Sequence, residues 1–370
     1  MTAKRRTTAW TLSWLCVLVI VYASLYPFED WRNQEIAPWS FVTAPWPKYN
    51  TWFDLNSNLL GYAPLGFWLC LAGMRSSYSR ARAWLLAAAG SCVLSFGMES
   101  MQTFLPVRMP SQLDWLLNTL GGMTGAAAAV VLERRGWLYR WSQFRREWLT
   151  HDAKGSLVLL ALWPLALLFP VTVPLGLGHV VDLLRRFLLE WFPDFETRFS
   201  TALEWLAQPM TPYFEMACVA LGLLVPGLLA MALCRRSGQR ISVLVAVTLL
   251  AVLGNALSAT LTYGPEHAWY WLTPQSGSGL ALGLCLLVLM VKRSERRLTQ
   301  TLFLLQLSLL LLLNLSPVST YYEQTMQTWE QGRFIRFHGL TPWLNWLWPW
   351  ALLFWAAWRL RHKDLHTHRL

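Results

Sequence analysis

The chain has 370 residues, of which 55% are hydrophobic and 14% charged, and its formal net charge is +11. This composition excludes an ordinary soluble domain, in which about a quarter of the residues are charged. The basic residues lie in short loops between apolar runs of about 20 residues, so the positive-inside rule of membrane proteins explains the charge better than a nucleic-acid partner does. We therefore expect an all-α, polytopic transmembrane helix bundle that contacts membrane lipids and no nucleic acid.

Ten apolar runs are predicted to cross the membrane as helices. They cover residues 9–27, 57–74, 82–103, 113–132, 156–174, 213–233, 241–261, 277–292, 298–315 and 341–359. The first run follows Lys4, Arg5 and Arg6 and lacks a small-residue cleavage site, which favours a retained helix over a signal peptide. Most Lys and Arg then fall on the side of the N-terminus, so we expect a bacterial inner (cytoplasmic) membrane protein with both termini in the cytoplasm.

Two domains are expected, residues 1–150 with four spans and residues 151–370 with about six. A weak internal similarity links them: Phe53-Asp54, Gly61 and Arg75 recur 161 residues later as Phe214-Glu215, Gly222 and Arg236. Two repeats of four spans (a 4+4 arrangement) would explain this similarity, and so would chance resemblance between apolar runs. Within the second domain, an apolar period of 3.6 residues predicts an amphipathic helix on the outer leaflet in segment 176–212.

Polar residues of the first four spans gather where these spans reach the outer side. Asp54 and Asn58 open the second span, Glu99 and Gln102 close the third, Asp114 and Asn118 open the fourth, and Arg108 lies in the loop between. An ionised side chain in hydrocarbon costs roughly 2.5–3.5 kcal/mol, so such residues in membrane spans mark functional sites. We interpret this cluster as the candidate site.

Several of these residues also have structural interpretations. Asp54 is equally compatible with a helix N-cap and with a site residue. Ser111 and Asp114 fit a capping box, in which Asp114 reaches back to the start of the fourth span. The pair Gly121 and Gly125 has the GxxxG spacing that favours close helix packing.

Glu99 lies inside an apolar run and needs a partner, and Arg108 is the nearest basic residue in the sequence. One interpretation is a structural ion pair of Arg108 with Glu99 or Asp114. In the other, Arg108 grips an anion such as a phosphate through two parallel hydrogen bonds. Glu99 or Asp114 would then act as a general base or as an oxygen ligand of a divalent cation.

Four sequence patterns in this region resemble a known family. The strings NLLGYAPLG, MESMQ, PVRMPSQLD and NTLGGMTG, together with their spacing, are similar to those of the VanZ-like family of bacterial membrane proteins over about residues 10–135. The resemblance implies that the motif residues are Asn58, Pro64, Gly66, Glu99, Gln102, Arg108, Asp114, Asn118 and Gly121. It also implies a link to tolerance of a glycopeptide antibiotic, a drug that acts on lipid-linked wall precursors.

We therefore expect a site at the outer membrane face that binds or processes an anionic or lipid-linked envelope head group. Arg108 would hold the phosphate, and Asn58, Gln102 and Asn118 would bond the sugar or peptide. The residues leave open whether a reaction is catalysed. No CxxC or HExxH spacing occurs, so no cofactor beyond a divalent cation is expected. The alternatives are a lipid or small-molecule transporter, and a scaffold whose aromatic loop Ser316–Gly339 binds an envelope partner.

Overall fold

A computed structural model of the chain describes residues 8–47, 52–150, 153–168, 171–181, 184, 187–188, 191–192, 211–315 and 340–367. Within these ranges the regular secondary structure is helical, and no strand is present beyond one isolated bridge between Leu149 and Cys234. The predicted all-α class is thus confirmed. Six helices are long and apolar enough to cross a membrane. The chain is a multi-pass helical membrane protein.

Each of the ten predicted spans falls on a helix. The helices are α1 (Thr8–Leu25), α2 (Trp52–Arg75), α3 (Arg80–Gln102), α4 (Gln112–Arg134), α6 (Ala153–Ala166), α10 (Pro212–Leu233), α11 (Ser237–Tyr263), α12 (Pro274–Met290), α13 (Glu295–Leu315) and α15 (Leu340–Thr367). The six that meet the length and hydropathy requirements of a span are α1, α3, α4, α10, α11 and α13, while α6 and α12 are apolar but shorter. Among the described residues, a further helix, α5 (Trp137–Trp148), was not predicted; it is rich in arginine and tryptophan.

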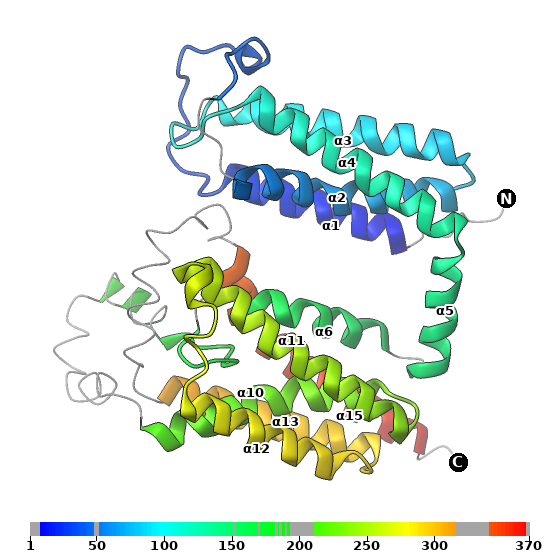
Figure 1. Cartoon of the computed structure of the whole chain (residues 1–370), viewed down its shortest axis with the longest axis vertical. Helices are drawn as coiled ribbons and strands as arrows, with labels where there is room; N and C mark the ends of the chain where they lie inside the picture. Colours follow the sequence, from blue (N-terminus) through cyan, green and yellow to red (C-terminus); the bar gives the residue numbers. More distant parts are fainter. Residues whose placement is uncertain are drawn as a thin grey trace. The chain divides into compact units, whose positions relative to one another are not determined.

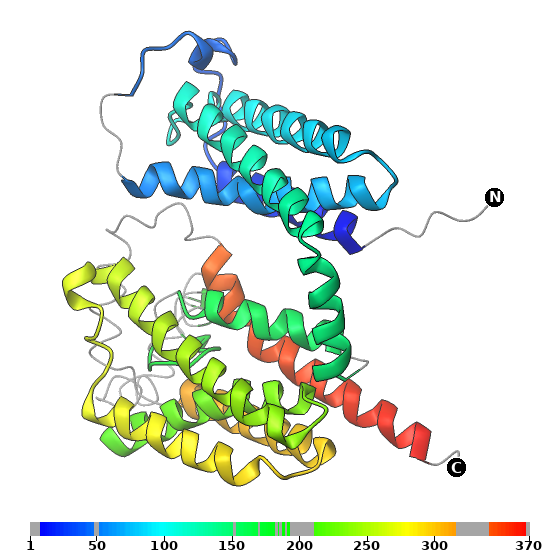
Figure 2. The same ribbon diagram turned by 45° about the vertical axis from the view of Figure 1, so that its right-hand side comes forward.

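The chain divides into two compact units, unit 1 (Met1–Gln143) and unit 2 (Phe144–Leu370). In unit 1, helices α1 to α4 pack side by side, as Figures 1 and 2 show from two directions. A short 3-10 helix, η1 (Ser40–Val42), lies in the loop between α1 and α2. This loop is at the end of the unit where α3 ends and α4 begins (Figure 1).

Helices α2 and α4 cross with their backbones in contact, and glycine makes this possible. A Cβ atom added at Gly121 would lie 2.1 Å from the carbonyl oxygen of Leu59, and one at Gly125 would lie 1.9 Å from that of Ala63. On the other side of the crossing, a Cβ atom at Gly66 would lie 1.9 Å from the Gly122 oxygen. Small residues at the contact allow such close approach of membrane helices. The crossing fixes the register between the two polar helix starts.

The α1–α2 loop is fastened to the α3–α4 loop by hydrogen bonds. The Arg32 N–H donates to the Phe104 carbonyl at 3.0 Å, and Gln34 Nε2 donates to the Thr103 carbonyl at 2.8 Å. Phe41 of η1 is buried, with its ring centroid 5.5 Å from that of Phe96. We call these two loops, residues 26–47 and 103–111, and the helix ends that they join the polar end of unit 1.

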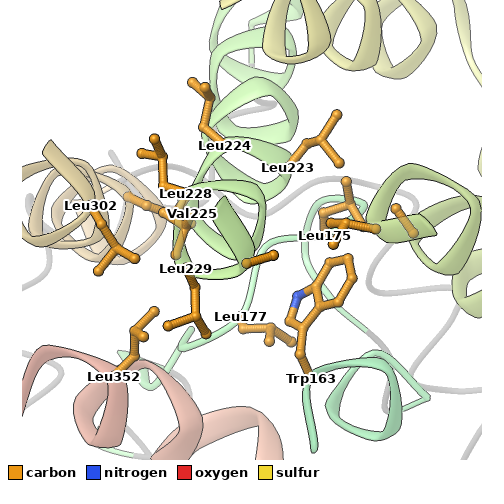
Figure 3. Packing of buried hydrophobic residues seen from close by; sticks show 14 of the residues in the cluster. Trp163, Leu175, Leu177, Leu223, Leu224, Val225, Leu228, Leu229, Leu302 and Leu352 are labelled. Atoms are coloured by element: carbon orange, nitrogen blue, oxygen red, sulfur yellow. The ribbon is translucent and has the colours of Figure 1, made fainter. Parts of the chain in front are cut away.

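Helix α10 lies at the centre of unit 2. Of an apolar 18-residue stretch of this helix, 83% is buried inside the structure. Figure 3 shows leucines of α10 among side chains from α6, α13 and α15: Leu223, Leu228, Leu229, Trp163, Leu302 and Leu352. A helix that is apolar on all sides and buried is the expected centre of a membrane helix bundle.

The predicted span 156–174 is too long, because helix α6 ends at Ala166. Residues 171–180 are described without helix, and most of them are buried. Side-chain amides hold their backbone: Asn345 Oδ1 accepts from the Gly178 N–H at 3.2 Å, and Asn314 Oδ1 accepts from the Val180 N–H at 2.8 Å. Buried non-helical chain at membrane depth requires such partners. The amphipathic helix expected in segment 176–212 therefore does not begin at its first residues. Most of that segment, like the loop 316–339, lies outside the described residues.

The contact between α2 and α4 has a counterpart in unit 2. A Cβ atom at Gly279 of α12 would lie 2.6 Å from the Met216 oxygen of α10, and one at Gly283 would lie 2.9 Å from the Ala220 oxygen. Met216 and Ala220 follow Leu59 and Ala63 by 157 residues, and Gly279 and Gly283 follow Gly121 and Gly125 by 158. The offset between the two helix crossings is thus about one helical turn shorter than the offset of 161 residues that the sequence similarity suggested.

Candidate functional site

The polar end of unit 1 contains a hydrogen bond between two site residues predicted from the sequence. Asn58 Nδ2 of α2 donates to Asp114 Oδ1 of α4 at 2.6 Å, and both side chains are partly buried. The bond joins the first turns of two parallel helices whose register is set by the glycine crossing. The pair retains partial exposure, so it can also meet a ligand.

Glu99 is almost fully buried, with 3% of its surface exposed. Its Oε2 accepts the backbone N–H of Ser111 at 2.8 Å, and the Ser111 hydroxyl in turn accepts the Leu113 N–H at 3.1 Å. Ser111 is the N-cap of α4, as the sequence predicted. In the predicted capping box, Asp114 accepts the backbone N–H of Ser111. In the structure, Glu99 accepts this N–H. One function of Glu99 is therefore to hold the start of α4 against the end of α3.

Arg108 and Gln102 both bind the C-terminus of α1. Arg108 Nη2 donates to the carbonyl oxygens of Tyr26 at 2.8 Å and Ala23 at 3.3 Å, and Gln102 Nε2 donates to that of Ser24 at 2.9 Å. The last carbonyls of a helix lack partners within the helix and carry partial negative charge, so a guanidinium is favourable there. Both of these Arg108 hydrogen bonds come from the same guanidinium nitrogen, Nη2.

A second layer of polar side chains lies one helical turn deeper. Asn118 follows Asp114 by four residues, and its Nδ2 donates to Ser95 Oγ of α3 at 3.0 Å. Ser95 in turn precedes Glu99 by four residues, so the two share a helix face. Both members of the Asn118–Ser95 pair are buried.

The remaining predicted residues lie on the same helices. Asp54 is in the first turn of α2, where its backbone carbonyl accepts from Ser57 Oγ at 3.1 Å. Pro64 and Gly66 lie further along α2, Gly66 at the crossing with α4. In the described part of the chain, no group of three or more His, Cys, Asp or Glu side chains could hold a metal ion.

Two residues of the polar layers were missed in the sequence, Ser95 and Tyr62. Tyr62 lies on α2 four residues after Asn58, and only 4% of its surface is exposed. Their spacing could have indicated both residues, because Ser95 lies one helical turn from Glu99 and Tyr62 lies one helical turn from Asn58. Serine and tyrosine are common in apolar helices, so a hydroxyl group there is a less specific sign of a site than a carboxylate is.

The polar end also exposes large apolar side chains. In the two loops and at the start of α2, these are Phe28, Trp31, Ile36, Trp39, Val42, Trp46, Trp52, Val107 and Met109. Met109 has 89% of its surface exposed and Trp52 82%. Tryptophan is enriched where membrane proteins cross the head-group region, which is consistent with these loops lying at that level.

Together, these observations define a multi-pass helical membrane protein whose N-terminal unit carries polar side chains in two layers at one end. Residues 6–133 match the protein-family model described as VanZ/LLP1. This segment is thus similar to the VanZ family, as its sequence motifs indicated, while the match does not extend into the rest of the chain. No curated protein matches the chain, and no solved structure matches it.

Proposed function

We propose that the polar end of unit 1 faces the extracytoplasmic side and binds the anionic head group of an envelope lipid or lipid-linked precursor. The observation that carries this proposal is the partly exposed Asn58–Asp114 pair, which shares one membrane-helix end with the guanidinium of Arg108. A carboxylate, an amide and a guanidinium offer both donors and acceptors to a polar head group.

The polar residues of unit 1 fall into two groups that differ in how far their side chains are buried. Glu99 and Asn118 are buried and bond to Ser111 and Ser95, so they maintain the fold of the polar end. Asn58, Asp114 and Arg108 keep partial exposure, so these are the residues we assign to ligand contact.

The exposed tryptophans support a ligand that is itself part of the membrane. Trp39, Trp46 and Trp52 extend from the polar end, and their rings favour the head-group region of a bilayer. A lipid whose acyl chains stay among such side chains presents its phosphate at the level of Arg108. Arginine is suited to that contact, because its planar group matches two phosphate oxygens.

Binding of fluorescently labelled phosphatidylglycerol to the purified protein in nanodiscs tests this proposal. Arg108→Gln removes the charge and is expected to weaken binding at least about tenfold, as for loss of a charge-assisted hydrogen bond. The matched control is Arg80→Gln, which removes an exposed guanidinium that pairs with Glu133 at 2.9 Å between α3 and the far end of α4.

Thermal unfolding of the same samples separates a binding role from a structural one. The proposal requires that Arg108→Gln loses binding while most of the protein remains folded. It fails if both arginine variants bind like the unchanged protein. It also fails if Arg108→Gln loses binding only in proportion to the loss of folded protein.

Transport is a second candidate function, and a specific observation in unit 2 favours it. Residues 171–180 form buried non-helical chain beside Asn314 and Asn345, and broken helices of this kind line substrate sites in transporters. Among the described residues, Gln306 of α13 is buried with neither amide atom hydrogen-bonded. Flux of a labelled lipid in proteoliposomes, lost in Gln306→Leu, would establish transport; no flux in the unchanged protein would exclude it for that lipid.

A further inference from the structure

Helix α5 (Trp137–Trp148) takes no part in the site described above. It follows α4 closely: Gly136 has a φ of +69°, a left-handed conformation that ends α4, and the chain then continues in another direction (Figures 1 and 2). Helix α4 has 23 residues and is about 35 Å long, more than the roughly 30 Å of a bilayer core. Helix α5 therefore begins at the level of the lipid head groups, at the end of unit 1 opposite to the polar end.

Both ends of α5 are attached to membrane helices. Near its start, Leu138 packs against Ala9 of α1 and Ala72 of α2. At its end, the Trp148 carbonyl oxygen accepts the backbone N–H of Arg235, which follows α10, at 3.0 Å. Helix α5 is thus held at the membrane surface from its first turn to its last.

One face of α5 carries a row of aromatic side chains. The residues of this row are Trp137, Trp141, Phe144 and Trp148. Their intervals of four, three and four residues place them on one face of the helix. No side chain of α5 is buried, and Trp137 is 55% exposed, Trp141 53% and Phe144 39%. An exposed aromatic row on a short amphipathic helix is the kind of surface that enters the head-group region of a bilayer.

An arginine lies on each side of the aromatic row. Arg140 is three residues after Trp137, and Arg145 is four residues after Trp141, so each is a neighbour of the row. The two arginines are five residues apart, which separates them by about 140° around the helix axis. Both are exposed. With the aromatic row in the head-group region, both guanidinium groups can reach lipid phosphates, since long basic side chains extend along an apolar surface toward the polar layer.

This end of unit 1 is strongly basic. In segments 75–82 and 133–140 the charged residues are Arg75, Arg80, Arg82, Glu133, Arg134, Arg135 and Arg140, and all the arginines among them are exposed. The single acid, Glu133, pairs with Arg80 at 2.9 Å. Such a surface repels a second copy of itself, whereas the phosphates of anionic lipids complement it. Basic clusters on amphipathic helices or directly beside a membrane span typically bind anionic lipids.

We infer that α5 is a membrane-surface helix that binds anionic phospholipids in the leaflet opposite to the proposed head-group site. Its aromatic row lies in the head-group region, and Arg140 and Arg145 hold the phosphates on either side of the row. A guanidinium suits this contact because its planar group matches two phosphate oxygens. This inference does not depend on the proposed function.

Nitroxide-labelled lipids test the inference on the full chain in nanodiscs of phosphatidylcholine. A fluorophore is attached to the aromatic row through Trp141→Cys, or to the opposite face through Tyr139→Cys, in a background without the six native cysteines. Both positions are exposed, Tyr139 at 62%. Each sample receives a trace of phosphatidylglycerol or phosphatidylcholine that carries a nitroxide near its head group. Short-range quenching of the fluorophore then reports which lipid contacts each face of α5.

The label at position 141 is expected to be quenched more strongly than the label at position 139. Nitroxide-labelled phosphatidylglycerol should quench it about fivefold more effectively than nitroxide-labelled phosphatidylcholine, the effect of one arginine near an anionic surface. Arg140→Gln combined with Arg145→Gln should abolish the difference between the two lipids.

The matched control is Arg146→Gln. Arg146 is seven residues after Tyr139, so this variant removes a guanidinium from the opposite face of the same helix, and the difference between the lipids should remain. Arg108→Gln should also leave it unchanged, because Arg108 lies at the polar end. Loss of the head-group site and loss of lipid binding by α5 are therefore distinguishable.

The inference is overturned if both labels are quenched alike, if the two lipids quench the label at position 141 equally, or if the double variant keeps the difference. It is also overturned if that label is shielded both from the lipid nitroxides and from iodide in the water. The aromatic row would then be covered by protein.

Discussion

The Glu99 carboxylate, at the end of α3, accepts the backbone N–H of Ser111, the residue that caps α4, at 2.8 Å. This bond spans the loop that contains Arg108, and it fixes both ends of that loop to the helix bundle. The acid that the sequence marked as a candidate base is thus also the residue that positions the candidate site.

Substitution of Glu99 separates its charge from its hydrogen bond. Glu99→Gln keeps an oxygen acceptor for the Ser111 N–H and is expected to fold, whereas Glu99→Leu leaves that N–H without this acceptor and should cost about 1–3 kcal/mol. Chemical denaturation in detergent, followed by tryptophan fluorescence, measures the difference. Equal stability of the two variants would show that the bond does not hold α4.

The glycine crossing gives a second prediction. Gly125→Ala places a methyl group against the Ala63 oxygen, so α2 and α4 must separate, and the protein is expected to lose folded yield and thermal stability. At Gly61 of α2, an added Cβ atom would have no other atom within 4 Å, so Gly61→Ala should be neutral or stabilise the protein by about 0.5–1 kcal/mol. Similar losses in both variants would argue against backbone contact at the crossing.

The positions of the spans followed from the sequence, because apolar length and loop charge are local properties. The polar ends of α2, α3 and α4 were found for the same reason. The pairing of Asn58 with Asp114 was not, since it depends on which turns of α2 and α4 meet at the glycines. Nor could the sequence show that Glu99 binds a backbone N–H, because any residue supplies one.

The end of α6 shows a further limit of sequence patterns. The apolar run continues past Ala166, and an apolar run alone does not distinguish helix from buried irregular chain. The local signals were Pro174, Gly176 and Gly178, which disfavour a continuous helix. The amides that bond this chain come from Asn314 and Asn345, more than 130 residues away, and no local pattern reveals them.

The Asn58–Asp114 pair predicts an effect of added charge. Asn58→Asp sets two carboxylates against each other at the distance of a hydrogen bond, so the variant should be less stable near neutral pH and recover when the pH falls far enough to protonate one of them. Asn58→Leu loses the bond without gaining charge and should show no such recovery. Melting temperatures between pH 4 and 8 provide the comparison; parallel curves for the two variants would refute direct contact with Asp114.

The proposed orientation is tested by cysteine labelling in a background without the six native cysteines. Met109→Cys, at an exposed position of the polar end, should react with a membrane-impermeant maleimide added to intact cells. Tyr78→Cys, in the α2–α3 loop at the other end of the bundle, should react only after the membrane is opened. The opposite pattern would place the polar end in the cytoplasm.

The most direct test of the central claim is an experimental structure of the full chain in nanodiscs that contain phosphatidylglycerol. The account predicts head-group density at the polar end, with the phosphate at Arg108 and close to the Asn58–Asp114 pair. A well-resolved polar end with side chains packed around Arg108 and no lipid density there would contradict it.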